Sequence, residues 1–302
     1  MSKYASPGAF RTALSAKLRT LSESSPWTVP QLRRQFAYDR LLERLYMLDD
    51  GWVIKGAVAL LARDIGVRAS LDIDVYRAKA ADAAEADLRL AAARDVGDWF
   101  RFEIGPRQTV GEGSKAMRFA ALAYIGQQQW ERFRIDLVGS DMRMVGEPDD
   151  VSAIAKVDMP ELQQTGYRAY PLVDHIADKV AATFDRYGES QQPSTRFRDL
   201  VDLVALARGA SVEAQQAVAA VRSEAERRNV ALPQSFDVPD RTQWEGGYAK
   251  EAAESLLTDA STLDEALAIV RPFVDPLLQG TARGVWDTGR STWSDPSNGA
   301  SS

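Results

Sequence analysis

The sequence lacks several residues from which protein active sites are commonly built. It contains no cysteine and a single histidine, His175, in 302 residues. The absence of cysteine excludes disulfides and cysteine-ligated zinc, and a lone histidine disfavours a histidine-ligated metal centre. Any metal site in this chain is therefore expected to use oxygen ligands.

Long apolar runs are also missing. No stretch approaches the roughly 20 apolar residues that a membrane-spanning helix needs, and the first residues lack the apolar core of a secretory signal. Hydrophobic residues make up 45% of the chain and charged residues 26%, which is ordinary for a globular protein. This composition predicts a cytoplasmic protein, and the length is sufficient for two domains.

Charge is distributed unevenly along the chain. The formal net charge of −6 disfavours indiscriminate binding to nucleic acid. The first 40 residues nevertheless contain seven lysines and arginines against one glutamate and one aspartate, a balance of 7 − 2 = +5. Such a basic surface is suited to contact phosphates and is equally typical of a solvated helix, so the charge pattern leaves both interpretations open.

The most informative segment alternates polar and apolar residues up to Tyr76. Because strand side chains alternate between faces, a strand over 68–77 places Ser70, Asp72 and Asp74 on one face. Two carboxylates on one face repel each other, and a divalent cation removes that penalty. Mg²⁺ is typically held by one or two carboxylates together with substrate phosphates. A solvated sheet face has the same pattern, so the segment alone does not decide between the two.

The neighbouring segments add parts of a nucleotide site. A short apolar strand runs into Gly56, and a helix over 58–64 follows it. A helix amino terminus offers unpaired N–H groups to a phosphate, and glycine lets the backbone come close. A helix is expected over 78–99 and a loop over 105–115. Two further strands are expected over 117–125 and 133–138, and the second carries Asp136 as a third carboxylate.

From Pro171 onward the pattern predicts mainly helix, and a capping box at Thr262 is expected to begin the last helix. Lys179 sits at the rim of an apolar stripe, where its ammonium can meet a triphosphate in a cleft or extend to water. His175 can be a general base, but we favour a residue at the surface or the edge of the helix, because it lies outside the apolar stripe. Asp199 borders the buried face of the next helix and Asp202 points further out. An acid at such a border pairs with a cation, caps the helix or orients Lys179 or a substrate.

Four segments in this order resemble the motifs of the AbiEii/AbiGii-type nucleotidyltransferase toxins, which include the mycobacterial MenT-type toxins. This group lies within the wider DNA polymerase β-like nucleotidyltransferase superfamily. The segments are Ile54–Leu60, Arg68–Asp74, Ile176–Ala181 and Arg198–Leu203. The resemblance spans roughly residues 30–275. One position departs from it, because Ala57 stands where the family usually has a second glycine or a serine.

The resemblance implies an α+β fold. Its first part is a nucleotidyltransferase core, a short mixed sheet flanked by helices, and a mainly helical C-terminal region follows. We place the core, with its N-terminal helices, at 1–145 and the helical domain at 146–302. The residues from about 280 onward are rich in glycine, serine and threonine, which predicts a loose tail.

The resemblance also implies a function. The family members are toxins that a cognate antitoxin neutralises, and they transfer a nucleotide from an NTP with the help of Mg²⁺. Some members modify the 3′ end of tRNA, so an RNA acceptor is expected here. Two alternatives stay open: transfer to a protein or a small molecule, and a non-catalytic toxin that only binds nucleotides.

Roles for individual residues follow from this reading. Asp72 and Asp74 are expected to bind the metal, while Asp136 completes a second metal position or acts as a base. The remaining contacts are to phosphate, and Asp199 is expected to hold Lys179 or the nucleotide. The expected phosphate contacts are Gly56, Ser70, Lys179 and Arg68, although Arg68 could instead pair with Asp72. The basic N-terminal helices, together with Arg186 and Arg196, are expected to meet the RNA backbone.

Overall fold

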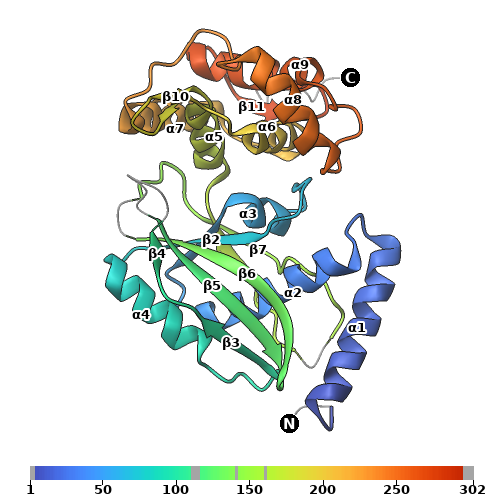
Figure 1. The fold of residues 1–302 in the computed structure, drawn as a ribbon. Coiled ribbons are helices and arrows are strands. Elements are labelled where there is room, and N and C mark those ends of the chain that lie inside the picture. Colours follow the sequence, from blue (N-terminus) through green and yellow to red (C-terminus); the bar gives the residue numbers. More distant parts are fainter. Residues whose placement is uncertain (1–3, 110–115, 140–141, 160–161, 295–302) are drawn as a thin grey trace. The chain divides into compact units, whose positions relative to one another are not determined.

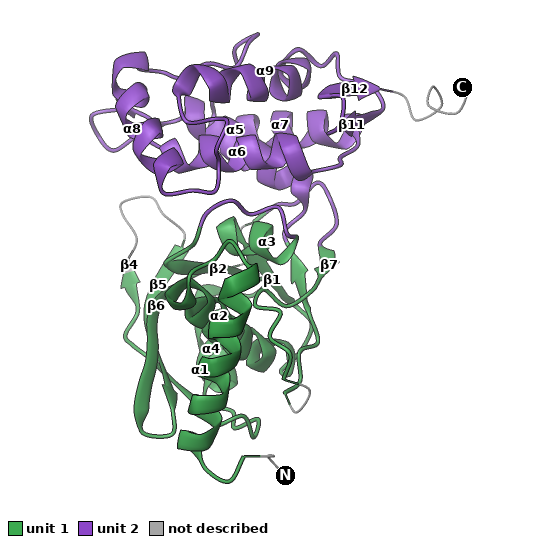
Figure 2. Cartoon of the chain, turned by 90° about the vertical axis from the view of Figure 1, so that its right-hand side faces the viewer, with its two compact units in different colours: residues 1–63, 69–142, 149–169 green, residues 64–68, 143–148, 170–302 purple. Residues whose placement is uncertain are grey.

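The computed structural model describes most of the chain (Figure 1). The described residues are 4–109, 116–139, 142–159 and 162–294. They divide into two compact units, shown in Figure 2. Unit 1 comprises residues 1–63, 69–142 and 149–169, and unit 2 comprises residues 64–68, 143–148 and 170–302. Two short segments from the first half of the chain thus group with the C-terminal unit.

Unit 1 is built on one mixed sheet. Its strands are β1 (Trp52–Lys55), β2 (Asp72–Arg77), β3 (Phe100–Ile104), β4 (Gln108–Thr109), β5 (Ala116–Ile125), β6 (Gln128–Val138), β7 (Asp149–Val151) and β8 (Tyr167–Ala169). Their order is β3-β5-β6-β2-β1-β8-β7, and β4 pairs with β5. The pairs β2–β6 and β1–β8 are parallel and the other neighbours antiparallel. This sheet with its helices confirms the predicted α+β class.

Helices cover one face of this sheet. They are α1 (Pro7–Ser24), α2 (Val29–Tyr46) and α4 (Ala81–Ala92), and a short α3 (Gly56–Ala62) follows β1 (Figure 1). Thr28 and Gln31 form a capping box that begins α2. Alternate residues of β5, from Met117 to Ile125, are buried in the core with the apolar side chains of these helices. The residues between them, Arg118 among these, therefore project to the opposite face.

Several boundaries in unit 1 differ from the prediction. The strand with alternating polar residues begins at Asp72 rather than at residue 68, because its pairing with β6 begins there. The helix expected over 78–99 ends at Ala92, and a turn with Gly97 at φ +73° leads into β3. β6 begins at Gln128, five residues before its predicted start. The loop expected over 105–115 contains β4, and residues 110–115 lie outside the described residues.

Unit 2 is mainly helical, as predicted. Its helices are α5 (Leu172–Phe184), α6 (Phe197–Gly209), α7 (Ala214–Arg228), α8 (Arg241–Ala253) and α9 (Leu263–Gln279). Two hairpins accompany them: β9 (Arg186–Tyr187) with β10 (Gln192–Pro193), and β11 (Val285–Asp287) with β12 (Thr292–Ser294). α5 packs against α6 and α7, and α6 packs against α8 and α9. Among the residues described, no helix combines the length and apolar character that a bilayer crossing requires.

The C-terminal segment is more ordered than the loose tail that we predicted. Residues 285–294 form the β11–β12 hairpin, and Trp286 is buried. The indole N–H of Trp286 donates to the carbonyl of Ala207 at 2.7 Å, and that of Trp293 donates to the carbonyl of Phe273 at 2.9 Å. Two large aromatic side chains thus hold the hairpin on α6 and α9, which outweighs the polar composition around them. Residues 295–302 lie outside the described residues.

Candidate active site

Gly56 lies directly against the carboxylate of Asp74. In the antiparallel pairing of β1 with β2, Lys55 is opposite Asp74, and Gly56 follows at the end of β1. A Cβ at Gly56 would lie 2.0 Å from Oδ2 of Asp74, and φ of Gly56 is +61°. This position therefore requires glycine for two independent reasons, its backbone conformation and its closeness to a carboxylate. Ala57, which departs from the family pattern, is buried in the first turn of α3.

The parallel pairing of β2 with β6 brings the three carboxylates predicted as metal ligands to one face. Asp74 lies directly opposite Asp136, and Asp72 lies opposite Arg134. Residues two apart on a strand share a face, so all three aspartates project from the same side of the sheet. This is the face opposite the buried Ile73 and therefore opposite the helices.

Two of these carboxylates are paired with arginines. Asp136 accepts two hydrogen bonds from Arg118, from Nε at 2.7 Å and from Nη2 at 2.6 Å. Asp72 accepts one from the Ser70 hydroxyl at 2.8 Å and one from Arg134 Nη2 at 3.2 Å. The hydrogen bond to Asp136 raises the pKa of Arg118 above its ordinary value. Ser70 thus reaches the site although it precedes the strand.

The donor set is chemically suited to Mg²⁺. Across the described ranges, no group of three or more acidic or imidazole side chains is arranged to hold a metal ion. Asp72 and Asp74 supply two carboxylates, which is the number that Mg²⁺ uses when substrate phosphates complete its shell. Asp136 could join them only after its two hydrogen bonds to Arg118 are exchanged.

Unit 2 holds the other predicted site residues in a buried chain of alternating charges. The Lys179 ammonium on α5 lies 3.1 Å from Oδ1 of Asp199 and 2.6 Å from Oδ2 of Asp202, both on α6. Arg68 binds Asp202 through two hydrogen bonds of 2.8 Å, and Arg196 binds Asp199. Lys179 is only 5% exposed. The contact between Asp199 and Lys179 agrees with one of the two roles expected for Asp199.

Burial and charge act in opposite directions on this chain. Burial by itself lowers the pKa of Lys179, but the charges of Asp199 and Asp202 raise it above its ordinary value. Burial likewise raises the pKa values of the two aspartates, and the neighbouring cations lower both below their usual range. All three groups are therefore charged at neutral pH, and each depends on its partners to remain so.

The structure corrects several expectations about orientation. Asp202, expected to point outward, is 1% exposed and central to the charge chain. Arg68 pairs with Asp202 rather than with Asp72, and its role as a phosphate contact stays a prediction. His175, expected at the surface or the edge of its helix, is not at the surface: it is 3% exposed and packs edge-on against Tyr170 with ring centroids 5.5 Å apart. Acids three apart on a helix share a face. The spacing of Asp199 and Asp202 is therefore the feature of the sequence that could have indicated that both carboxylates contact Lys179.

The basic residues near the N-terminus do not act as one free surface. Arg40 is buried and donates to Asp98 at 2.6 Å, as part of the core of unit 1. The guanidinium groups of Arg33 and Arg11 lie 4.5 Å and 5.4 Å from the ring centroid of Trp130. A cation over an aromatic face is attracted to it, so these side chains already have partners within the fold.

The other cations expected to meet RNA differ in their availability. Arg196 is engaged by Asp199, although its side chain remains 51% exposed. Arg186 is exposed and donates to the carbonyl of Gln191 at 3.0 Å. Lys3 lies outside the described residues.

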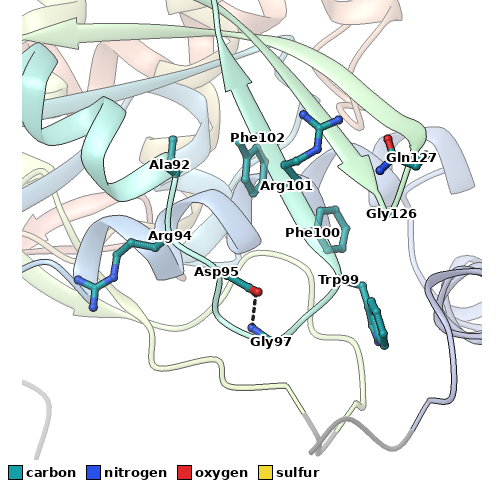
Figure 3. A pocket seen from close by; sticks show the side chains of 11 residues that line it. Ala92, Arg94, Asp95, Gly97, Trp99, Phe100, Arg101, Phe102, Gly126 and Gln127 are labelled. Atoms are coloured by element: carbon teal, nitrogen blue, oxygen red, sulfur yellow. Dashed lines mark hydrogen bonds between the residues drawn. The ribbon is translucent and has the colours of Figure 1, made fainter.

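A pocket of about 580 Å³ opens at one end of the sheet in unit 1 (Figure 3). It lies where β3 begins, beside the turn between β5 and β6, and includes Trp99, Phe100 and Phe102 together with Arg94 and Arg101. None of the residues predicted for the nucleotide site lines this pocket. The pocket is therefore not assigned to nucleotide binding, and the carboxylate face of unit 1 and the charge chain of unit 2 are each considered by themselves.

Comparison with solved structures supports the fold. The chain is similar to MenT4, a nucleotidyltransferase toxin from Mycobacterium tuberculosis H37Rv, with a TM-score of 0.51 and 16% identity over 89% of this chain and 99% of that chain. It is also similar to JHP933 from Helicobacter pylori, with a TM-score of 0.46 and 15% identity over 82% of this chain and 91% of that chain. A search of curated protein sequences finds no match. The similarity to MenT4 shows a shared fold.

Comparison with protein families identifies the chain more directly. The family described as nucleotidyl transferase AbiEii toxin, type IV toxin–antitoxin system, matches residues 40–269, which is more than half of the chain. The match lies within the span of residues 30–275 over which the resemblance was predicted. The protein belongs to the AbiEii family of nucleotidyltransferase toxins from type IV toxin–antitoxin systems.

Proposed function

We propose that this toxin uses Mg²⁺ to transfer a nucleotide from an NTP to an RNA acceptor, with the 3′ end of tRNA as the expected acceptor. The observation that carries the proposal is the placement of Asp72, Asp74 and Asp136 on one sheet face, with Gly56 against Asp74. Carboxylates clustered beside a half-buried glycine at the start of α3 are suited to a cation that bridges the phosphates of a nucleotide.

The residues of unit 1 take the central roles in this proposal. Asp72 and Asp74 hold the cation, which when bound stabilises the charge that develops on the transferred phosphoryl group. Asp136 either holds a second cation or accepts the proton of the attacking hydroxyl. The Ser70 hydroxyl, now 2.8 Å from Asp72, and the backbone at Gly56 bind phosphate oxygens. Because α3 has only seven residues, its contribution as a helix dipole is small beside that of direct contacts.

The residues of unit 2 provide positive charge for the phosphates. Lys179 neutralises charge on the leaving pyrophosphate, and Asp199 holds either Lys179 or the nucleotide. The side chains of Arg68 and Arg196, at the ends of the charge chain, are 17% and 51% exposed. Within the charge chain, these two arginines are the cations that a phosphate can reach from solvent.

The family also implies a partner and a setting. We propose that a cognate antitoxin neutralises the protein and that both act in the cytoplasm. An open reading frame for a small protein beside the toxin is the simplest supporting observation. Co-expression of that protein is expected to restore growth of cells that produce the toxin.

The proposed activity is tested with labelled nucleotides. The protein is incubated with each α-labelled NTP and with tRNA, in the presence and absence of Mg²⁺. We expect label in RNA, with one or a few of the NTPs, and only when Mg²⁺ is present. Label in protein or in a small molecule but not in RNA would overturn the proposed acceptor.

A pair of variants separates catalysis from mere binding. Asp72→Asn removes a proposed metal ligand and is expected to abolish both transfer and toxicity. Asp150→Asn changes an exposed carboxylate of β7 in the same unit and serves as the matched control. Full toxicity of Asp72→Asn would indicate that the toxin acts by binding alone.

A further inference from the structure

We infer that Arg118 and Arg134 also bind the triphosphate of the substrate. In this inference the two arginines compete with a divalent cation for Asp136 and Asp72, and they turn to the phosphates once the cation holds the carboxylates. The inference rests on the proposed function, because it concerns the same carboxylates.

The strand register places these arginines within the carboxylate cluster. One row across the sheet contains Arg118 on β5, Asp136 on β6 and Asp74 on β2. The next row contains Arg134 on β6 beside Asp72 on β2. Directly opposite residues on neighbouring strands are close enough for their side chains to meet. Both guanidinium groups therefore lie where phosphates of a nucleotide bound by these aspartates must also lie.

These two ion pairs are partly exposed to solvent. The side chains of Arg118 and Arg134 are 30% and 47% exposed. The carboxylates of their partners Asp136 and Asp72 are 14% and 30% exposed, so solvent reaches both pairs and weakens them. In the same unit Arg40 and Arg44 bind Asp98 with side chains at most 2% exposed, as expected of structural pairs. The contrast favours a role for Arg118 and Arg134 in binding.

Chemistry explains why the arginines change partners. A carboxylate that accepts two hydrogen bonds from Arg118 cannot offer the same oxygens to a cation, and the guanidinium repels the cation. Once the cation occupies the carboxylate, the guanidinium loses its partner and lies beside the phosphates that the cation attracts. The planar guanidinium matches two phosphate oxygens at once, which makes arginine the better residue for this contact than lysine.

The test measures two affinities that are expected to move in opposite directions. The variants are Arg118→Gln and Arg134→Gln, and the control is Arg132→Gln. Arg132 is exposed on β6, two residues before Arg134, and its side chain has no ion pair among the described residues. Binding of Mn²⁺ alone is followed by electron paramagnetic resonance, and binding of inorganic tripolyphosphate at saturating Mn²⁺ is followed by calorimetry.

We expect both variants to bind Mn²⁺ about fivefold to tenfold more tightly than the unchanged protein, because a competing positive charge is removed. We expect them to bind tripolyphosphate about 10- to 100-fold more weakly, because a charge-assisted hydrogen bond is lost. The control is expected to change neither affinity. A purely structural role would move the two affinities together or leave both unchanged, and either result overturns the inference.

A third measurement distinguishes the phosphates of the nucleotide from those of RNA. If the variants bind tripolyphosphate normally but bind tRNA more weakly, the arginines contact the acceptor, and their assignment to the triphosphate is wrong. If the unchanged protein transfers nucleotides but the two variants bind Mn²⁺ and tripolyphosphate normally, only the inference is overturned. If the unchanged protein transfers no nucleotide but the two affinities of the variants shift in opposite directions, the proposed function is rejected and the inference is retained. A protein that binds no Mn²⁺ overturns both.

Discussion

Aspartates paired with cations occur in both units, but their surroundings differ. In unit 1, Asp72 and Asp136 lie on a sheet face and pair with arginines that are about one-third to one-half exposed. In unit 2, Asp199 and Asp202 are at most 4% exposed, and Lys179 between them is equally enclosed. Exposed pairs exchange partners at low cost, whereas buried pairs do not. The same residue types therefore form partly exposed pairs in unit 1, which we infer exchange partners when substrate binds, and enclosed pairs in unit 2.

The sharpest way to break this comparison is to remove the central cation of unit 2. Lys179→Met leaves Asp199 and Asp202 buried with less compensation, so we expect the unfolding free energy of unit 2 to fall by about 3–5 kcal/mol. Lys250→Met, at an exposed position of α8, is the matched control and should cost less than about 0.5 kcal/mol. Hydrogen exchange of amides in α5 and α6 gives a readout specific to this unit. If Lys179→Met lowered the unfolding free energy no more than Lys250→Met does, the charge chain would not stabilise unit 2.

The pH dependence of that loss provides a second measurement. Asp199 and Asp202 have pKa values below their usual range, so their contribution is present above the ordinary carboxyl pKa of about 4 and is lost as pH falls through the lowered values. Lys179 has a raised pKa, so its contribution persists up to its ordinary pKa of about 10 and is lost only above it. We expect the stability difference between the protein and Lys179→Met to be constant between pH 5 and 9 and to shrink below pH 4. Denaturant unfolding at several pH values tests this, and a difference that vanishes near pH 6 would contradict it.

Patterns confined to a few neighbouring residues were the ones that sequence predicted well. The alternation of Asp72 with Asp74 and the glycine at residue 56 both depend on local backbone geometry, and the structure brings them together. The capping box at Thr262 is local in the same sense. The long apolar-rich segments after residue 171 also carried the prediction of a helical unit, because helical periodicity needs no knowledge of distant partners.

Partners far apart in the chain escaped prediction. Arg68 binds Asp202, which is 134 residues away, and nothing near Arg68 indicates α6 as its destination. Arg118 meets Asp136 through the antiparallel register of β5 on β6, which depends on where the turn between the strands falls. The polar tail was expected to be loose because composition does not reveal that Trp286 has a buried site against α6 and α9.

Gly56 offers a test of how closely the carboxylate face of unit 1 is fitted. Gly56→Ala forces an alanine to φ +61° and places its Cβ 2.0 Å from Asp74, so the carboxylate must move. A displacement of about 1 Å in an active site can reduce the rate about 100-fold, and we expect a loss of at least that size. Gly97→Ala is the matched control, since Gly97 has φ +73° but no atom within 4 Å of a new Cβ. It shares the backbone strain of about 1–2 kcal/mol without the contact.

The readout for this pair is nucleotide transfer measured beside thermal stability. Equal losses of activity in the two variants would attribute the effect to backbone strain and remove the argument that Gly56 makes room for Asp74. A selective loss in Gly56→Ala, with similar melting temperatures for both, would show that the position of the Asp74 carboxylate limits the reaction.

The smallest expected effect concerns the stability contributed by an exposed pair of unit 1. Arg134→Gln is expected to change the unfolding free energy by less than about 1 kcal/mol, because its pair with Asp72 is largely solvated. Arg44→Gln, which breaks a buried pair with Asp98 in the same unit, is expected to cost about 3–5 kcal/mol. Added salt should reduce the first effect further and leave the second nearly unchanged, since screening acts on solvated charges. If Arg134→Gln destabilised the unit as much as Arg44→Gln, its pair with Asp72 would be a structural element, and the distinction between exchangeable and fixed charges in this protein would fail.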